Sequence, residues 1–190
     1  MNLPLTLQAR FVPQPLPLIL KLWSMVGTVA TNKQTVYTPN ILWLDGSDGE
    51  IAAAVREAQR SFDRYRDALA QTSQVVADCG VKVFFPSQQD PKAGEHMWVN
   101  EVTFGSGDFL GTLCNDPGWL PGPLCGDRVS FTLDRVSDWF YVIAGEFHGG
   151  FSLKLLYRHY TPEQFAECRD DPPACYLADW YDELRREAKG

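Results

Sequence analysis

The sequence lacks an apolar run of membrane-spanning length, a cysteine pair spaced as C-x-x-C and any local cluster of histidines, of which it has three in 190 residues. A transmembrane helix needs roughly 18 or more consecutive apolar residues, so no membrane span is expected. The apolar N-terminus has no basic start and is interrupted by Pro4, Pro13, Pro15 and Pro17, which is atypical of a signal peptide. These absences predict a soluble, cytoplasmic protein.

The cysteines and histidines are too scattered to predict a cofactor. Five cysteines leave one without a partner, which favours reduced thiols over a disulfide framework. In an exported chain, Cys168 could pair with Cys175, or Cys114 with Cys125. A metal site needs three convergent ligands, and no zinc-binding motif is present. We therefore expect neither a metal nor another cofactor.

The charge balance makes nucleic acid and membrane surfaces poor partners. The chain carries 17 basic and 24 acidic residues, a net charge of -7, which repels phosphate backbones and anionic lipids. A basic protein would instead be attracted. Acidic composition also serves solubility alone, so the charge leaves both readings open.

Three regions differ in their pattern of apolar residues. Residues 1–46 are proline-rich and predict an extended segment with two or three short strands. Residues 47–160 begin with a helix to about residue 70, for which Ser47 and Glu50 form a capping-box motif. One apolar stripe at spacings of three and four runs along this helix. Its members are Ile51, Val55, Ala58, Phe62, Tyr65 and Leu69.

From residue 81 the apolar period changes to two, which is typical of strands. The candidates are 81–85, 96–104, 109–114, 128–133, 138–143 and 150–157. Short turn-rich connections favour antiparallel pairing. Residues 161–190 predict a helical tail, with a Thr161–Gln164 capping box and an apolar last helix. The expected fold is α+β: a strongly curved antiparallel sheet or small open barrel of five to six strands, with a packed N-terminal-side helix and C-terminal helices.

Glu95 and His96 are the most conspicuous polar pair in the predicted sheet. Neighbours in a strand point to opposite faces, so the two side chains cannot act together as an acid–base pair. His96 should share its face with Trp98, and Glu95 should share the other face with Met97. One polar group is therefore expected at the rim of whichever face is buried.

An aromatic surface is the second candidate site. Asp138 precedes Trp139 and two further aromatics, and it could cap a turn or accept a hydrogen bond from Arg128 or His96. Tryptophans are more often core than ligand contacts. If Trp98, Trp119 and Trp139 are partly exposed, they form with Glu95, His96 and Asp138 a groove suited to a protein or peptide.

Several motifs together resemble the YegJ-like bacterial family catalogued as domain of unknown function 2314. They are Lys82-Val83-x-Phe85, Glu95-His96-Met97-Trp98-Val99, Phe109-x-Gly111-x-Leu113-x-Asn115-x-Pro117, Gly126-Asp127-x-Val129, Asp138-Trp139 and Gly149-Gly150-x-Ser152. The resemblance covers about residues 48–157. It implies an architecture, and it carries over no activity and no catalytic residues. A looser likeness to small acidic immunity proteins is an analogy only.

We expect a noncatalytic protein-interaction module, of which an acidic immunity or inhibitor protein that binds a basic toxin is one example. The alternative enzyme is a small hydrolase that uses His96 or His148 with Glu95 or Asp138. The alternative structural protein is a homodimer joined through the C-terminal helix.

Overall fold

The computed structural model describes residues 49–71, 76–105 and 107–187. They form one six-stranded antiparallel sheet in the order β4-β3-β2-β1-β5-β6, with helices on both sides. The strands are β1 (Val76–Pro86), β2 (Gly94–Phe104), β3 (Phe109–Leu113), β4 (Arg128–Phe131), β5 (Val136–Ile143) and β6 (Glu146–Gly149). The sheet is open and not closed, which confirms the α+β prediction. The two or three strands expected in residues 1–46, and the Ser47 cap, lie outside the described residues.

The first face of the sheet is covered by two helices, α2 (Gly49–Arg60) and α3 (Phe62–Gln71). The predicted stripe packs there, with Ala58, Phe62 and Tyr65 buried against core residues of β1, β2 and β5. Burying such side chains stabilises the fold by roughly 1.5–3 kcal/mol for each large apolar residue. The predicted stripe is confirmed, but it runs along two helices, α2 and α3, where one continuous helix was predicted.

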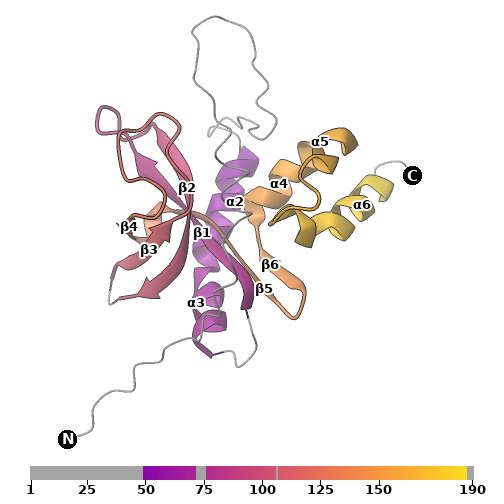
Figure 1. Ribbon diagram of the computed structural model, residues 1–190, viewed down its shortest axis with the longest axis horizontal. Coiled ribbons are helices and arrows are strands. Elements are labelled where there is room, and N and C mark those ends of the chain that lie inside the picture. Colours follow the sequence, from indigo (N-terminus) through magenta and orange to yellow (C-terminus); the bar gives the residue numbers. More distant parts are fainter. Residues whose placement is uncertain (1–48, 72–75, 106, 188–190) are drawn as a thin grey trace, which may run out of the picture.

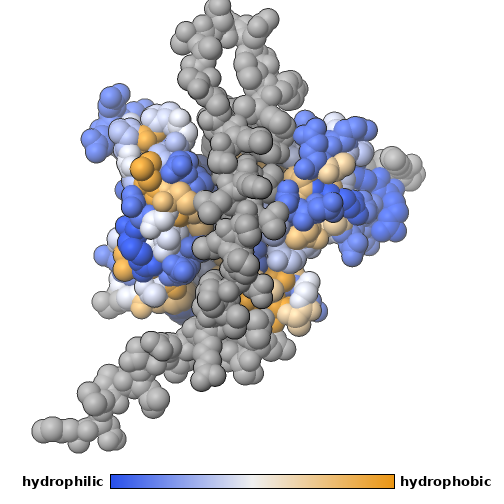
Figure 2. Space-filling model, in the orientation of Figure 1, coloured by the Kyte–Doolittle hydropathy of each residue, from blue (hydrophilic) through white to orange (hydrophobic). Residues whose placement is uncertain are grey.

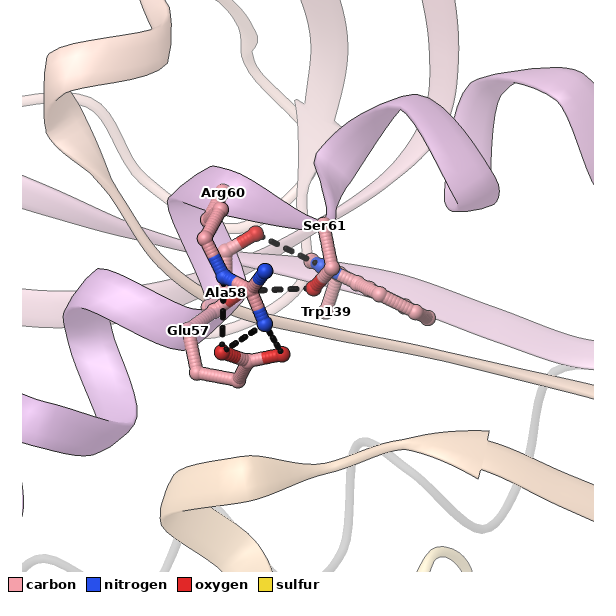
Figure 3. Close-up of polar contacts among 5 residues, drawn as sticks. All are labelled: Glu57, Ala58, Arg60, Ser61 and Trp139. Carbon is pink, nitrogen blue, oxygen red and sulfur yellow. Dashed lines mark hydrogen bonds and ion pairs between the residues drawn. The ribbon is translucent and has the colours of Figure 1, made fainter.

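The helix breaks at Ser61 (Figure 3). The Ser61 hydroxyl donates to the Glu57 carbonyl over 2.6 Å, a back-bond that is known to bend helices. The Trp139 indole N–H donates to the Ala58 carbonyl over 2.9 Å. In an unbroken helix that carbonyl would accept from the amide of Phe62. The Trp139 side chain of β5 thus occupies the Ala58 carbonyl in place of a helix amide, and this bond stabilises the break.

The second face is covered at its β5–β6 end by C-terminal helices (Figure 1). These are α4 (Phe151–His159), α5 (Pro162–Ala166) and α6 (Ala178–Glu187), with a short 3-10 turn η2 (Ala174–Leu177) between the last two and another, η1 (Leu133–Arg135), before β5. The Thr161–Gln164 capping box is present, with bonds of 3.3 and 2.8 Å. The last helix docks on its own chain, because Tyr181 is buried and stacks on Phe165 with ring centroids 3.9 Å apart.

The strand predicted at 150–157 is wrong, because this segment is helix α4. Leu153, Leu155 and Tyr157 are all buried, so the apolar pattern has the period of a strand. Helix α4 contacts α2, β5 and α6, which bury it from several sides at once. A helix buried on more than one side need not show a single apolar stripe. The sixth strand is instead β6.

Candidate functional site

The carboxylate of Glu95, near the start of β2, holds a loop that joins β3 to β4. One oxygen accepts from the amide of Gly118 at 2.7 Å, and the other accepts from Trp119 at 3.3 Å and Leu120 at 2.9 Å. Three successive amides turned toward one anion make a concave binding site for negative charge. We call residues 115–125 the anchored loop. Glu95 therefore serves the surface by shaping this loop.

Both ends of the anchored loop are fixed by the sheet. At its start, the buried Asn115 side chain accepts from the amide of Trp98 at 3.0 Å. At its end, Gly126 has a φ of +93° and its amide donates to the Leu113 carbonyl, while the amide of Leu113 donates to the backbone carbonyl of Asp127. This is a glycine bulge of the kind that requires the left-handed conformation at its first residue. The loop is therefore fixed to the sheet at both ends and by Glu95 in between.

The anchored loop presents two large apolar side chains to solvent. Trp119 is 51% exposed and Leu124 is 58% exposed. Beside them is a pocket of about 250 Å³, lined mainly by Phe85, Met97, Pro117, Leu120, Pro121 and Pro123. This is smaller than the roughly 300–1,000 Å³ typical of small-molecule sites. It is the size of a recess for one or two side chains, since a cavity of about 150 Å³ already holds benzene.

His96 lies on the opposite face of the sheet from Glu95, as predicted. Its Nδ1 is 2.9 Å from the Ser137 hydroxyl, which donates its proton to the Lys82 carbonyl at 3.1 Å. The hydroxyl must therefore accept from Nδ1–H, and this assignment leaves Nε2 without the proton. His96 as a whole is exposed, but its ring lies against Phe84 with centroids 4.9 Å apart. Burial of the ring there and the nearby charge of Lys82 lower the pKa of His96 to about 4.

Asp138 is fully buried and caps helix α4 from strand β5. Its carboxylate accepts from the amides of Phe151, Ser152 and Leu153 at 2.7–3.3 Å and from the Ser152 hydroxyl at 2.6 Å. These amides have no partner within the helix. Burial raises the pKa of Asp138, while the bonds from Ser152 and the charge of Lys82 oppose that shift. The capping role of Asp138 is therefore structural.

The six predicted site residues do not form one surface. Trp139 is 2% exposed in the core under α2 and α3, and Trp98 is 7% exposed in the core on the other face. The ammonium group of Lys82 lies 5.8 Å from the centre of the Trp98 ring. Only Trp119 among the three tryptophans is open to a partner. Glu95 acts beside it, whereas His96 and Asp138 lie elsewhere.

The predicted acid–base pairs are not brought together. Both carboxylates, Glu95 and Asp138, bind backbone amides, and His96 binds Ser137. His148 stacks on the Tyr141 ring and lies 3.7 Å from Glu146. Within residues 49–71, 76–105 and 107–187, no three His, Cys, Asp or Glu side chains are grouped so that they could hold a metal ion. The described part of the chain has no helix long and apolar enough to cross a bilayer.

Sequence reasoning missed the pocket beside the anchored loop. The proline-rich wall of this pocket can be seen in the sequence between Cys114 and Cys125. The other wall comes from Phe85 and Met97 on two strands, and no spacing rule connects these residues to the loop. A second hollow, of about 590 Å³, lies along α5 and α6 and is lined by charges of both signs. One of its acids, Asp182, is already paired with Arg169 at 2.6 Å.

Fold and site together define a small α+β protein with a preorganised apolar surface loop. Residues 48–171 match the family described as "Uncharacterized protein conserved in bacteria (DUF2314)", and the chain belongs to this family. This confirms the resemblance seen in the sequence motifs.

Two relatives align with about two thirds of this chain. The chain is 32% identical over 123 residues to the uncharacterized protein YegJ of Escherichia coli, covering 63% of this chain and 74% of YegJ. It is 28% identical over 132 residues to a putative ankyrin repeat protein of Neisseria meningitidis serogroup B, covering 67% of this chain. That alignment covers 52% of the Neisseria protein, so the chain spans about half the length of this relative. No solved structure matches the chain.

Proposed function

We propose that the protein is a noncatalytic interaction module that binds another protein through the anchored loop. The observation that carries the proposal is the grip of the Glu95 carboxylate on three successive amides, which holds Trp119 exposed in a fixed loop. Tryptophan is among the residues most enriched at binding hot spots. A loop that is ordered in advance also loses less conformational entropy on binding.

The position of the loop supports this proposal. It lies on the β3–β4 side of the sheet, whereas α4–α6 cover the β5–β6 side. In the space-filling view, hydrophobic residues are interspersed with hydrophilic ones over the strand half, while the outer end of the C-terminal helices is largely hydrophilic (Figure 2). The partner would therefore meet the strand half, and the C-terminal helix would stay docked on its own chain.

The net charge of -7 favours a basic partner. An immunity or inhibitor protein that blocks a basic toxin fits this description, and it is the form of the proposal that we favour. We expect such a protein in the cytoplasm, where free cysteines stay reduced. The Neisseria relative is named for ankyrin repeats, which build extended binding surfaces, but that name specifies no partner for this chain.

The test uses the full chain as bait in a native lysate of its own host. Wild type should retain one dominant protein, and Trp119→Ala should lose it. Leu133→Ala is the matched control, because Leu133 is 43% exposed in η1, outside the loop. Retention by Trp119→Ala, or equal loss from both variants, would refute the anchored loop as the binding surface.

A further inference from the structure

We infer that the pocket beside the anchored loop receives one apolar side chain from a basic segment of the partner, with an adjacent arginine or lysine on Trp119. This rests on the proposed function and deepens it by naming the chemistry of the bound segment.

The walls of the pocket are mainly apolar, although Gln88 adds a polar side chain, and the loop wall is preorganised. Phe85 comes from β1, Met97 from β2, and Leu120 with three prolines from the anchored loop. Proline fixes its own φ, so this wall changes little when the pocket is filled. The Glu95 carboxylate holds the amide of Leu120 at 2.9 Å and so fixes the loop side of the pocket. An apolar side chain that enters the pocket is therefore buried with little loss of conformational entropy in the loop.

The charges around the pocket are mostly negative. Residues 113–127 contain Asp116 and Asp127 and no lysine or arginine. Asp90 and Glu95 add two carboxylates, against one lysine, Lys92, in the β1–β2 turn and one arginine, Arg128, after the loop. Asp116 accepts from the amide of Cys125 and Asp127 from the amide of Leu124, both at 2.8 Å, and both residues are exposed. Their charges are therefore fixed in place and accessible. An acidic partner segment would be repelled, and a basic one would be attracted.

Trp119 adds a reason to expect a cation next to the apolar anchor. An arginine or lysine within about 6 Å of an indole ring is attracted to the negative face of that ring. The ring is half exposed and belongs to the same loop as the pocket wall. One short basic segment can therefore use both features.

The test is selection of a displayed random dodecapeptide library against three full-length proteins: wild type, Gly122→Lys and Gly107→Lys. Gly122 lines the pocket and Gly107 lies in the β2–β3 turn. A Cβ at either position meets nothing within 4 Å, and neither has a positive φ. Both variants add one positive charge. The two positions are about 20 Å apart, because Gly122 lies in the pocket with Met97, Gly107 follows Phe104 at the end of β2, and Met97 and Phe104 are seven strand residues from each other.

Wild type should enrich peptides with a leucine, isoleucine, methionine or phenylalanine next to arginine or lysine. Gly122→Lys should weaken their binding at least about tenfold, and Gly107→Lys less than about twofold. Enrichment of acidic or uncharged peptides, no enrichment, or equal effects of the two lysines would overturn the inference. If Trp119→Ala abolishes partner binding while Gly122→Lys changes nothing, the loop remains the docking surface and only the pocket assignment fails.

Discussion

Two carboxylates that a sequence reader would take for catalytic groups, Glu95 and Asp138, both bind backbone amides instead. Each faces a run of N–H groups, one in a loop and one at a helix start. A carboxylate so engaged can be worth about 1.5–3 kcal/mol per charged hydrogen bond. Both carboxylates therefore hold segments of backbone in place.

Glu95→Gln should loosen the anchored loop. Glutamine keeps one acceptor oxygen but turns an N–H₂ group toward amides that also donate. We expect amide exchange at Gly118–Leu120 to rise by about ten- to a hundredfold, equivalent to about 1.4–2.7 kcal/mol. Glu101→Gln is the control, because Glu101 lies on the same strand and accepts from the Thr112 hydroxyl, not from the anchored loop. Unchanged exchange in Glu95→Gln would contradict the anchoring role.

His96 should titrate far below an ordinary histidine. Burial and the charge of Lys82 lower its pKa from 6.5 to about 4. The neutral form is thus favoured by folding, so His96 contributes stability above pH 6.5 that is lost as the pH falls through 4. Histidine NMR shifts should show a titration near pH 4 with the proton on Nδ1, and Lys82→Met should move the pKa upward. A midpoint at 6.5 would refute this environment.

The divergence of Glu95 and His96 could be read from the sequence because it follows from strand alternation alone. The same rule separates Trp98 from Met97. It could not place Trp98 and Trp139 relative to each other, because that depends on register. Val81 pairs with both Val99 and Trp139, whereas Lys82 pairs with Trp98 and Asp138. The two tryptophans therefore face opposite sides, and the predicted aromatic groove divides between two cores.

At the scale of elements, Asp138 decides that residues 151–159 form a helix. Asp138→Asn should destabilise the protein by about 2–4 kcal/mol, because it leaves helix amides without an acceptor in a buried site. Ser152→Ala removes only the hydroxyl bond and should cost about 1 kcal/mol. Urea unfolding measures both. Equal losses in the two variants would mean that the carboxylate is not the main cap.

Trp139→Phe tests the bond that joins β5 to the helix break. It removes the indole donor to the Ala58 carbonyl and part of a packed ring, so we expect a loss of about 1–3 kcal/mol by urea unfolding. Trp180→Phe is the control, because Trp180 is only partly buried on α6. A loss no larger than that of the control would show that the indole bond contributes little.

The elements predicted best are those whose signal is local. The stripe of α2 and α3, the Thr161 cap and most strands carry their pattern within ten or so residues. Helix α4 has no such local signal. Its cap, Asp138, lies 13 residues before Phe151, and its neighbours α2, β5 and α6 bury it from several sides. Strand β1 was expected from Val81 and starts at Val76. Its extra residues include Gly80, which lies close under the Phe140 and Trp98 rings.

On the scale of the whole molecule, both faces of the sheet carry packed helices, and the anchored loop is the surface through which we propose binding. Helices α2 and α3 cover one face, and α4–α6 cover the β5–β6 part of the other. The anchored loop joins β3 to β4 and is held against the start of β2 by Glu95, and Trp119 and Leu124 are exposed on it. This division explains how an acidic domain can be stably folded and still present an apolar contact.

The most direct measurement is calorimetric titration of the purified partner with wild type, Trp119→Ala and Leu133→Ala. A tryptophan hot spot is worth at least about 2 kcal/mol, so Trp119→Ala should weaken binding about 30-fold or more, with an unchanged melting temperature. Leu133→Ala should bind within about twofold of wild type. Wild-type affinity in Trp119→Ala, or the same weakening in both variants, would contradict the account.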